Sequence, residues 1–260
     1  LYIRSFLQVA QDRHWNYNLI EAFDQPWKRK LEGTVGGYWG IYSTNFTQKF
    51  AFIGPIAERH DGIKTIVAAT LGVLVFLGLG LVIQALNKNT VVALTSLGAL
   101  FGLFGLLQYE YLLAACRTQE EFFALGGIAL LGWISILCMP FYLLNHHQHA
   151  KTLIQLSAVA LMLAALTANY WLIMDGRYRD FAISLYALPV IQISLGLLAS
   201  KQAIRHSLGF FKALGIILVA SAMACLYKES SNLLAWAWLG LNLLLAVANW
   251  PKKDTSHIHH

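Results

Sequence analysis

The run TIVAATLGVLVFLGLGLVIQAL, at residues 65–86, decides the fold. It contains no charged side chain, and about twenty apolar residues in a helix cross the roughly 30 Å hydrocarbon core of a bilayer. Backbone groups in lipid must satisfy their hydrogen bonds internally, so such a run is expected to be helical. Similar runs follow at about residues 90–115, 121–144, 152–174, 181–200, 207–227 and 231–250. The sequence predicts a mainly α, multi-pass membrane bundle of seven helices over residues 63–251.

Composition supports this class of protein. The chain is 57% hydrophobic and only 12% charged, which is unusual for a soluble domain. Its net charge of +6 is spread over short loops, as orientation signals are, and does not predict a nucleic-acid partner. The three cysteines lie in apolar runs, where a thiol behaves as a small hydrophobe, and predict neither a disulfide nor a zinc site.

Histidines form two clusters, one in a loop and one in the polar tail at residues 252–260. Imidazoles at such spacing are able to hold a divalent metal, but no carboxylate or thiol accompanies them, and we predict no metal and no cofactor. The clusters are His146, His147 and His149, and His257, His259 and His260.

Lysine and arginine counts predict the orientation of the bundle. With the N-terminal segment outside the cytoplasm, seven basic residues fall on the cytoplasmic side and five on the opposite side. This bias favours an external N-terminus and a cytoplasmic C-terminus. In a bacterium the N-terminal segment would be periplasmic and the bundle would lie in the inner membrane. The cytoplasmic set is Lys88, Lys151, Lys201, Arg205, Lys212, Lys252 and Lys253, and the external set is Lys64, Arg117, Arg177, Arg179 and Lys228.

Small and polar residues within the apolar runs predict contacts between helices. Gly98 and Gly102 form a small-xxx-small pair that permits close helix approach. Single amides within the runs are suited to interhelical hydrogen bonds, and they do not form an evident ion pathway. These amides are Gln84, Gln155, Asn169, Gln192 and Asn242.

Residues 1–62 have a different pattern. Apolar residues at helical spacing predict a helix to about Arg13, and residues 16–23, rich in aromatic and branched side chains, predict a short strand. The glycines that follow, from Gly33 to Gly40, predict a loop that carries Tyr38 and Trp39. We expect the membrane domain to start near Gly62.

This region contains EAFDQPWK at residues 21–28, then EG at 32–33 and WG at 39–40. The pattern resembles the carboxyl-terminal end of glycoside hydrolase family 17 domains, above all bacterial members fused to membrane helices. The resemblance covers about sixty residues and implies the last helix–strand–loop unit of a truncated TIM (β/α)8 barrel. It also implies that the family's acid/base and nucleophilic glutamates are missing from this chain, which contains no catalytic residue of its own.

The resemblance and barrel geometry together predict a sugar-binding rim, since residues just past a barrel strand face the active-site mouth. Lys28 and Glu32 resemble the family's supporting Lys and Glu, whereas Gln25 stands where plant members have Glu. Polar side chains would bind sugar hydroxyls, and an indole would stack on a glucosyl ring. The alternative is a loop held by its own salt bridges, with the indoles packed against the barrel. The predicted substrate-binding residues are Glu21, Asp24, Gln25, Trp27, Lys28, Glu32 and Trp39.

These observations lead to two hypotheses on function. In the first, the chain is the C-terminal part of a membrane-anchored β-glucan-acting enzyme, a retaining transglycosylase that elongates or β-1,6-branches β-1,3-glucan, or an endo-β-1,3-glucanase. Its partners would be β-glucan, the bilayer and a glucan synthase, and this chain alone is expected to be inactive. In the second, the bundle is a carrier, export partner or scaffold for glucan synthesis without catalysis of its own. Aromatic residues lining a groove between helices would favour the carrier.

Overall fold

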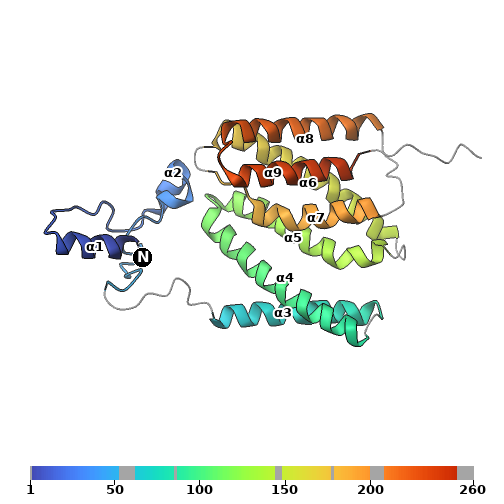
Figure 1. Ribbon diagram of the computed structural model, residues 1–260, viewed down its shortest axis with the longest axis horizontal. Coiled ribbons are helices and arrows are strands. Elements are labelled where there is room, and N and C mark those ends of the chain that lie inside the picture. The colour runs from blue at the N-terminus through green and yellow to red at the C-terminus, as the bar shows by residue number, and fades with distance from the viewer. Residues whose placement is uncertain are drawn as a thin grey trace, which may run out of the picture.

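A computed structural model of the chain describes residues 2–52, 62–84, 87–143, 148–176, 179–199 and 208–250. In these ranges it is helical, with loops and isolated bridges between the helices and no β-strand (Figure 1). The N-terminal segment contains α1 (Tyr2–Asp12), a short 3-10 helix η1 (Pro26–Lys28) and α2 (Arg29–Gly36). The bundle contains α3 (Gly62–Val82), α4 (Lys88–Ala115), α5 (Gln119–Leu143), α6 (Gln148–Met174), α7 (Ile183–Ala199), α8 (Leu208–Lys228) and α9 (Leu233–Ala248).

Each predicted apolar run corresponds to one of these bundle helices. Five of them, α3, α4, α5, α6 and α8, are long and apolar enough to cross a membrane, which indicates a multi-pass membrane protein. The other two, α7 and α9, are also apolar but have 17 and 16 residues. Consecutive helices run in alternating directions, so the loops after α4, α6 and α8 lie at the end nearest the N-terminal segment (Figure 1).

Helices α3 and α4 form a hairpin that packs through glycine, as the predicted small-xxx-small pair requires. A Cβ added to Gly102 would lie 2.0 Å from the carbonyl oxygen of Ala68, and one on Gly72 would lie 2.0 Å from the carbonyl oxygen of Gly98. Backbones this close leave no room for a side chain. The hairpin stands beside the other helices, and α4 contacts α5 and α7 (Figure 1).

Helices α5 to α9 surround an apolar core that includes Ile154, Leu161 and Ile193, each fully buried. Within this core Asn169 of α6 is also fully buried and joins three helices. Its Nδ2 donates to Asn242 Oδ1 of α9 at 3.2 Å and to Ser221 Oγ of α8 at 2.8 Å. The predicted use of Asn169 and Asn242 in interhelical hydrogen bonds is confirmed.

The N-terminal segment confirms the first predicted helix and corrects two other predictions. Residues 16–23 form no strand; Phe23 makes one isolated parallel bridge to Tyr42, and Tyr42 makes an antiparallel bridge to Gln48. Aromatic and branched residues favour a strand, but a ladder needs a neighbouring strand, and the described segment supplies only these bridges. The predicted glycine loop begins instead as α2, which Gly33 kinks with φ 75°.

Candidate functional site

A cavity of about 810 Å³ opens at the end of the bundle nearest the N-terminal segment. Its walls come from α4, α5, α6, the start of α7 and α9, and part of its mouth comes from Glu32 and Gly33 of α2. Small side chains leave this space open, because alanine occupies positions on three adjacent helices. These positions are Ala114 and Ala115 of α4, Ala124 of α5, and Ala164 and Ala168 of α6. The volume lies in the range typical of small-molecule sites.

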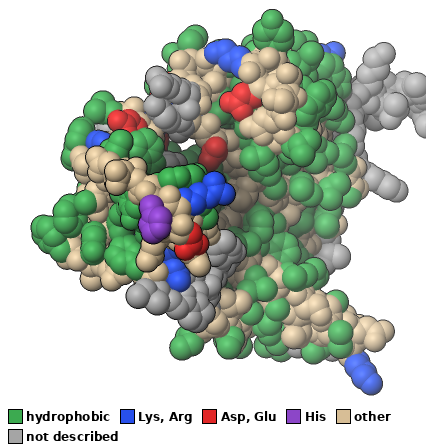
Figure 2. Space-filling model, turned by 60° about the vertical axis from the view of Figure 1, so that its left-hand side comes forward, with side chains coloured by type: hydrophobic (Ala, Val, Ile, Leu, Met, Phe, Trp, Pro, Cys, Tyr) green, Lys and Arg blue, Asp and Glu red, His purple; other side chains and the backbone are tan. Residues whose placement is uncertain are grey.

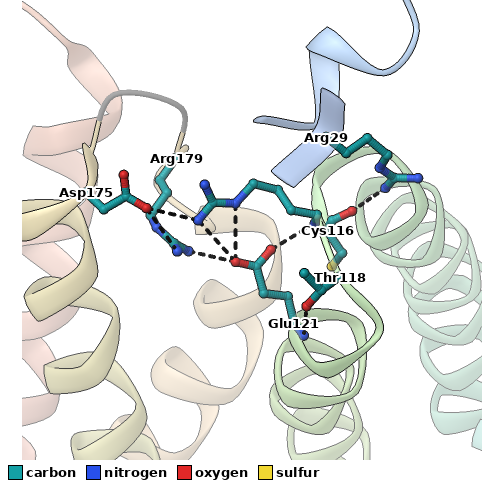
Figure 3. A network of polar contacts seen from close by, with 7 residues as sticks. Arg29, Cys116, Thr118, Glu121, Asp175 and Arg179 are labelled. Carbon is teal, nitrogen blue, oxygen red and sulfur yellow. Dashed lines mark hydrogen bonds and ion pairs between the residues drawn. The ribbon is translucent and has the colours of Figure 1, made fainter. Parts of the chain in front are cut away.

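Charged side chains from two loops and the start of a helix form a network at this mouth. We call this network the collar, and it consists of Arg117, Glu121, Asp175 and Arg179. Arg179 Nη1 lies 2.9 Å from Glu121 Oε1, and Arg117 Nη2 lies 3.2 Å from Asp175 Oδ2. Figure 3 shows Asp175, Arg179 and Glu121 converging from different elements. The collar ties the α4–α5 loop to the α6–α7 loop, and its side chains are only partly exposed.

Aromatic residues line the cavity from the mouth inward. Trp171 lies near the mouth, with the Arg179 guanidinium 5.1 Å from its ring centroid. Further in, Tyr186 of α7 meets Trp238 of α9 edge to face at 4.9 Å between ring centroids. The Trp238 indole N–H donates to Asn169 Oδ1 at 2.6 Å, and the Tyr186 hydroxyl donates to the Ala164 carbonyl at 3.1 Å. Their polar atoms are therefore satisfied, and the rings present an apolar surface to the cavity.

The N-terminal segment lies against the end of the bundle, and charged side chains show on the segment while the visible flank of the bundle is mainly hydrophobic (Figure 2). Arg29 donates a hydrogen bond to the carbonyl oxygen of Cys116, just after α4 (Figure 3). Cys116 is 3% exposed, and burial raises the pKa of its thiol to about 11. A protonated thiol is a weak nucleophile, so the residue acts here as packing at neutral pH.

Two of the predicted rim residues form an ion pair. Lys28 donates to Glu21 Oε1, and both side chains are largely shielded from solvent. The hydrogen bond to Glu21 raises the pKa of Lys28 above its usual value. Glu21 has φ 69°, a left-handed conformation unusual for a residue other than glycine, and the ion pair helps to hold it there.

Asp24 is part of the local structure of the same segment. Its side chain is 6% exposed, and Oδ1 accepts from Lys49 Nζ at 2.8 Å and from the backbone N–H of Gly40 at 3.0 Å. Gly40 is required at this point, because a Cβ would lie 2.2 Å from the backbone of Phe23 and Asp24. Sequence reasoning missed Lys49, whose partner lies 25 residues earlier in the chain.

The other predicted rim residues are more accessible. Trp27 is 63% exposed and Trp39 is 48% exposed, and the Lys28 ammonium lies 5.7 Å from the Trp27 ring centroid. Gln25 is partly buried and precedes η1. Glu32 lines the cavity of the bundle, and its Oε2 is a buried atom without a hydrogen-bond partner in the described structure. The structure thus separates Glu32, at the cavity, from the exposed indoles.

Sequence reasoning did not identify the collar or the cavity. It counted Arg117 and Arg179 only as orientation signals. Each of these arginines has a carboxylate four residues away in the sequence, and this spacing could have indicated the ion-pair network. In the described residues no group of three or more His, Cys, Asp or Glu is placed to hold a metal ion. Of the histidine clusters, His149 is exposed at the start of α6, and the others lie outside the described residues.

Comparisons with protein-family models, with curated proteins and with solved structures find no match for this chain.

Proposed function

We propose that this chain is the membrane-bound part of a protein that acts on β-glucan at the outer face of a bacterial inner membrane. Its N-terminal segment, as part of a family 17-like barrel, would contribute to a sugar-binding rim on the periplasmic side. The bundle would keep that rim at the membrane surface. The reaction would be retaining transfer between β-glucan chains, or hydrolysis, with the catalytic glutamates supplied by other parts of the barrel.

The observation that carries this proposal is the presence of two exposed indoles, one of which lies beside an ion pair. Trp27 and Trp39 expose about half or more of their surface, in a segment whose motifs resemble the glucan-binding end of a barrel. An exposed indole offers its face to the apolar C–H surface of a pyranose. Lys28, which is paired with Glu21, places its ammonium 5.7 Å from the Trp27 ring centroid.

A second candidate function, the carrier, is favoured by the cavity. Aromatic rings from α4, α6, α7 and α9 line it, and it opens next to the segment that holds the predicted rim. In that role the bundle would receive or hold a glucan in addition to anchoring the rim. Pro140 and Pro189 lie within α5 and α7, where a proline removes a backbone hydrogen bond and permits bending.

The enzyme proposal is tested with the complete protein that the gene encodes, including any reading frame upstream of residue 1. It is incubated with β-1,3-gluco-oligosaccharides, and the products are resolved by mass and linkage. Longer or branched products would establish a transglycosylase, and shorter products alone a glucanase. A reading frame that encodes neither a barrel nor a pair of catalytic glutamates would overturn the enzyme proposal. The function would then have to be sought in the membrane domain.

The rim is tested by binding. In purified protein, Trp27→Ala with Trp39→Ala should weaken binding of laminari-oligosaccharides about tenfold or more, because each stacking contact is lost. Trp15→Ala is the matched control, since Trp15 is 48% exposed in the same segment but outside the predicted rim. Equal affinity in the double variant and the control would rule out these indoles as the binding surface.

A further inference from the structure

The cavity has the dimensions and position of a site for one lipid molecule in one leaflet. Ile128 lies nine residues into α5 and Ala164 lies ten residues before the end of α6. At 1.5 Å per residue, the cavity reaches about 14 Å inward from the helix ends. Half of a bilayer's hydrocarbon core is about 15 Å thick. The depth therefore matches one leaflet.

The inner wall of the cavity suits a hydrocarbon chain. It is formed by alanines and larger apolar side chains from the membrane-spanning helices, and the tyrosine and tryptophan at its inner end have their polar atoms bound to other groups. An apolar chain would replace no hydrogen bond there. The inner residues include Leu125, Ile128, Leu172, Tyr186 and Trp238.

The mouth selects the headgroup by its charges. In the described structure Arg117 and Arg179 are each paired with both Glu121 and Asp175, while Asp180 and Glu32 add further carboxylates to the lining. Arg29, the nearby third cation, is bound to the Cys116 carbonyl and to the Tyr38 hydroxyl. The carboxylates pair with both guanidiniums that line the cavity and outnumber them, so the mouth does not favour a phosphate group.

Two buried atoms of the residues that line the mouth have no hydrogen-bond partner in the described residues. Arg179 Nε is a donor and Glu32 Oε2 is an acceptor. A hydroxyl is both a donor and an acceptor, so a polyhydroxylated, uncharged group would satisfy both atoms once these shielded side chains turn toward it. Trp171, 44% exposed and next to Arg179, adds an aromatic face suited to a sugar ring.

We propose that this cavity binds a lipid with an uncharged sugar headgroup. The sugar lies between Glu32, Arg179 and Trp171, and the hydrocarbon chain extends along the alanine-lined wall. Glu32 and Gly33 of α2 partly cover the headgroup, which places the bound sugar next to the N-terminal segment. The proposal rests on the cavity alone and is independent of activity on β-glucan.

The test uses the full chain in phosphatidylcholine nanodiscs containing a fluorescent monoglucosyl-diacylglycerol, with unlabelled lipids as competitors. Monoglucosyl-diacylglycerol should displace the probe at concentrations at least tenfold lower than phosphatidylglycerol or phosphatidylethanolamine. Ala168→Phe, which fills the cavity from α6, should reduce probe binding at least tenfold. Ala160→Phe is the control, because Ala160 is exposed on the same helix and does not line the cavity.

Headgroup recognition is tested separately with Glu32→Ala, which removes the acceptor from a residue outside the bundle and leaves the membrane helices intact. This variant should reduce the preference for the glucosyl lipid several-fold without reducing the helix content measured by circular dichroism. Equal displacement by glucosyl lipid and phosphatidylglycerol would overturn the proposal. Equal probe binding by Ala168→Phe and Ala160→Phe would also overturn the proposal, provided that both variants remain monodisperse.

Discussion

The N-terminal segment and the five-helix core of α5 to α9 are stabilised in different ways. In the described part of the segment, the buried hydrophobic side chains are those of Ala10 and Ile41, and much of the remaining contact is made by ion pairs and aromatic rings. The core instead buries many large apolar side chains and uses a few fully bonded polar groups. The bundle is therefore stabilised by burial of its own apolar side chains. The segment depends instead on polar contacts and on docking against the bundle through Arg29.

The largest expected effect on stability comes from disrupting the contact between α3 and α4. Gly72→Leu places a side chain where the α4 backbone lies, and we expect a loss of about 3 kcal/mol or more in the free energy of unfolding. The measurement is unfolding in mixed micelles followed by circular dichroism. Gly78→Leu is the matched control on α3, because a Cβ at Gly78 meets nothing within 4 Å. Equal stability of the two variants would contradict the close packing described here.

The second prediction removes the polar junction of the core. Asn169→Leu removes the acceptor of the buried Trp238 indole N–H and the donor to Ser221 Oγ of α8, and it should cost about 2 kcal/mol. Trp238 fluorescence should shift together with the unfolding transition. Thr152→Leu, at an exposed site on the same helix, should change stability little. A stable Asn169→Leu variant would show that apolar packing alone specifies the core.

The same contrast explains which parts of the fold the sequence predicted. Each bundle helix follows from a long apolar run, because lipid leaves the backbone no alternative to internal hydrogen bonds. Asn169 was identifiable as a lone amide in such a run, and Gly98 and Gly102 were identifiable by their spacing. In the segment, where composition constrains the backbone less, the predicted strand at residues 16–23 was wrong, and Lys49 was not linked to Asp24.

The cavity was not predictable from the sequence for a different reason. Ala124 and Ala168 are ordinary residues of apolar helices, and only the arrangement of those helices turns several alanines into an open space. The collar likewise joins Arg117 to Asp175, which lie 58 residues apart. By contrast, the proposed rim depends on the short motif at residues 21–28, and its role in binding glucan stays a prediction.

The third prediction concerns the polar contacts of the segment. Asp24→Ala leaves the Gly40 N–H and the Lys49 ammonium without their shared acceptor, at a local cost of about 1–2 kcal/mol. Hydrogen exchange at residues 22–49 should accelerate, while exchange in α5 to α9 should not. The control is Asp12→Ala, at an exposed position at the end of α1. Acceleration that extended into the bundle would show that the two regions unfold together.

The smallest expected effect is a dependence on alkaline pH confined to the segment. The hydrogen bond to Glu21 raises the pKa of Lys28 in the folded chain, so the ammonium is held more tightly than in the unfolded chain. The stabilisation is fully present below the usual lysine pKa and disappears as the pH rises through the higher folded value. Deprotonation also removes the cation from the Trp27 ring, so Trp27 fluorescence should report it.

Lys28→Arg separates this transition from other effects of high pH. A guanidinium keeps its charge where an ammonium loses it, so the alkaline change in Trp27 fluorescence should disappear in this variant. Trp27→Phe should remove the signal, and Trp15→Phe should leave it in place. An alkaline transition that persists in Lys28→Arg would assign it to another group. A transition that also changed the circular dichroism of the bundle would mean that the Lys28–Glu21 pair supports the membrane helices as well as the segment.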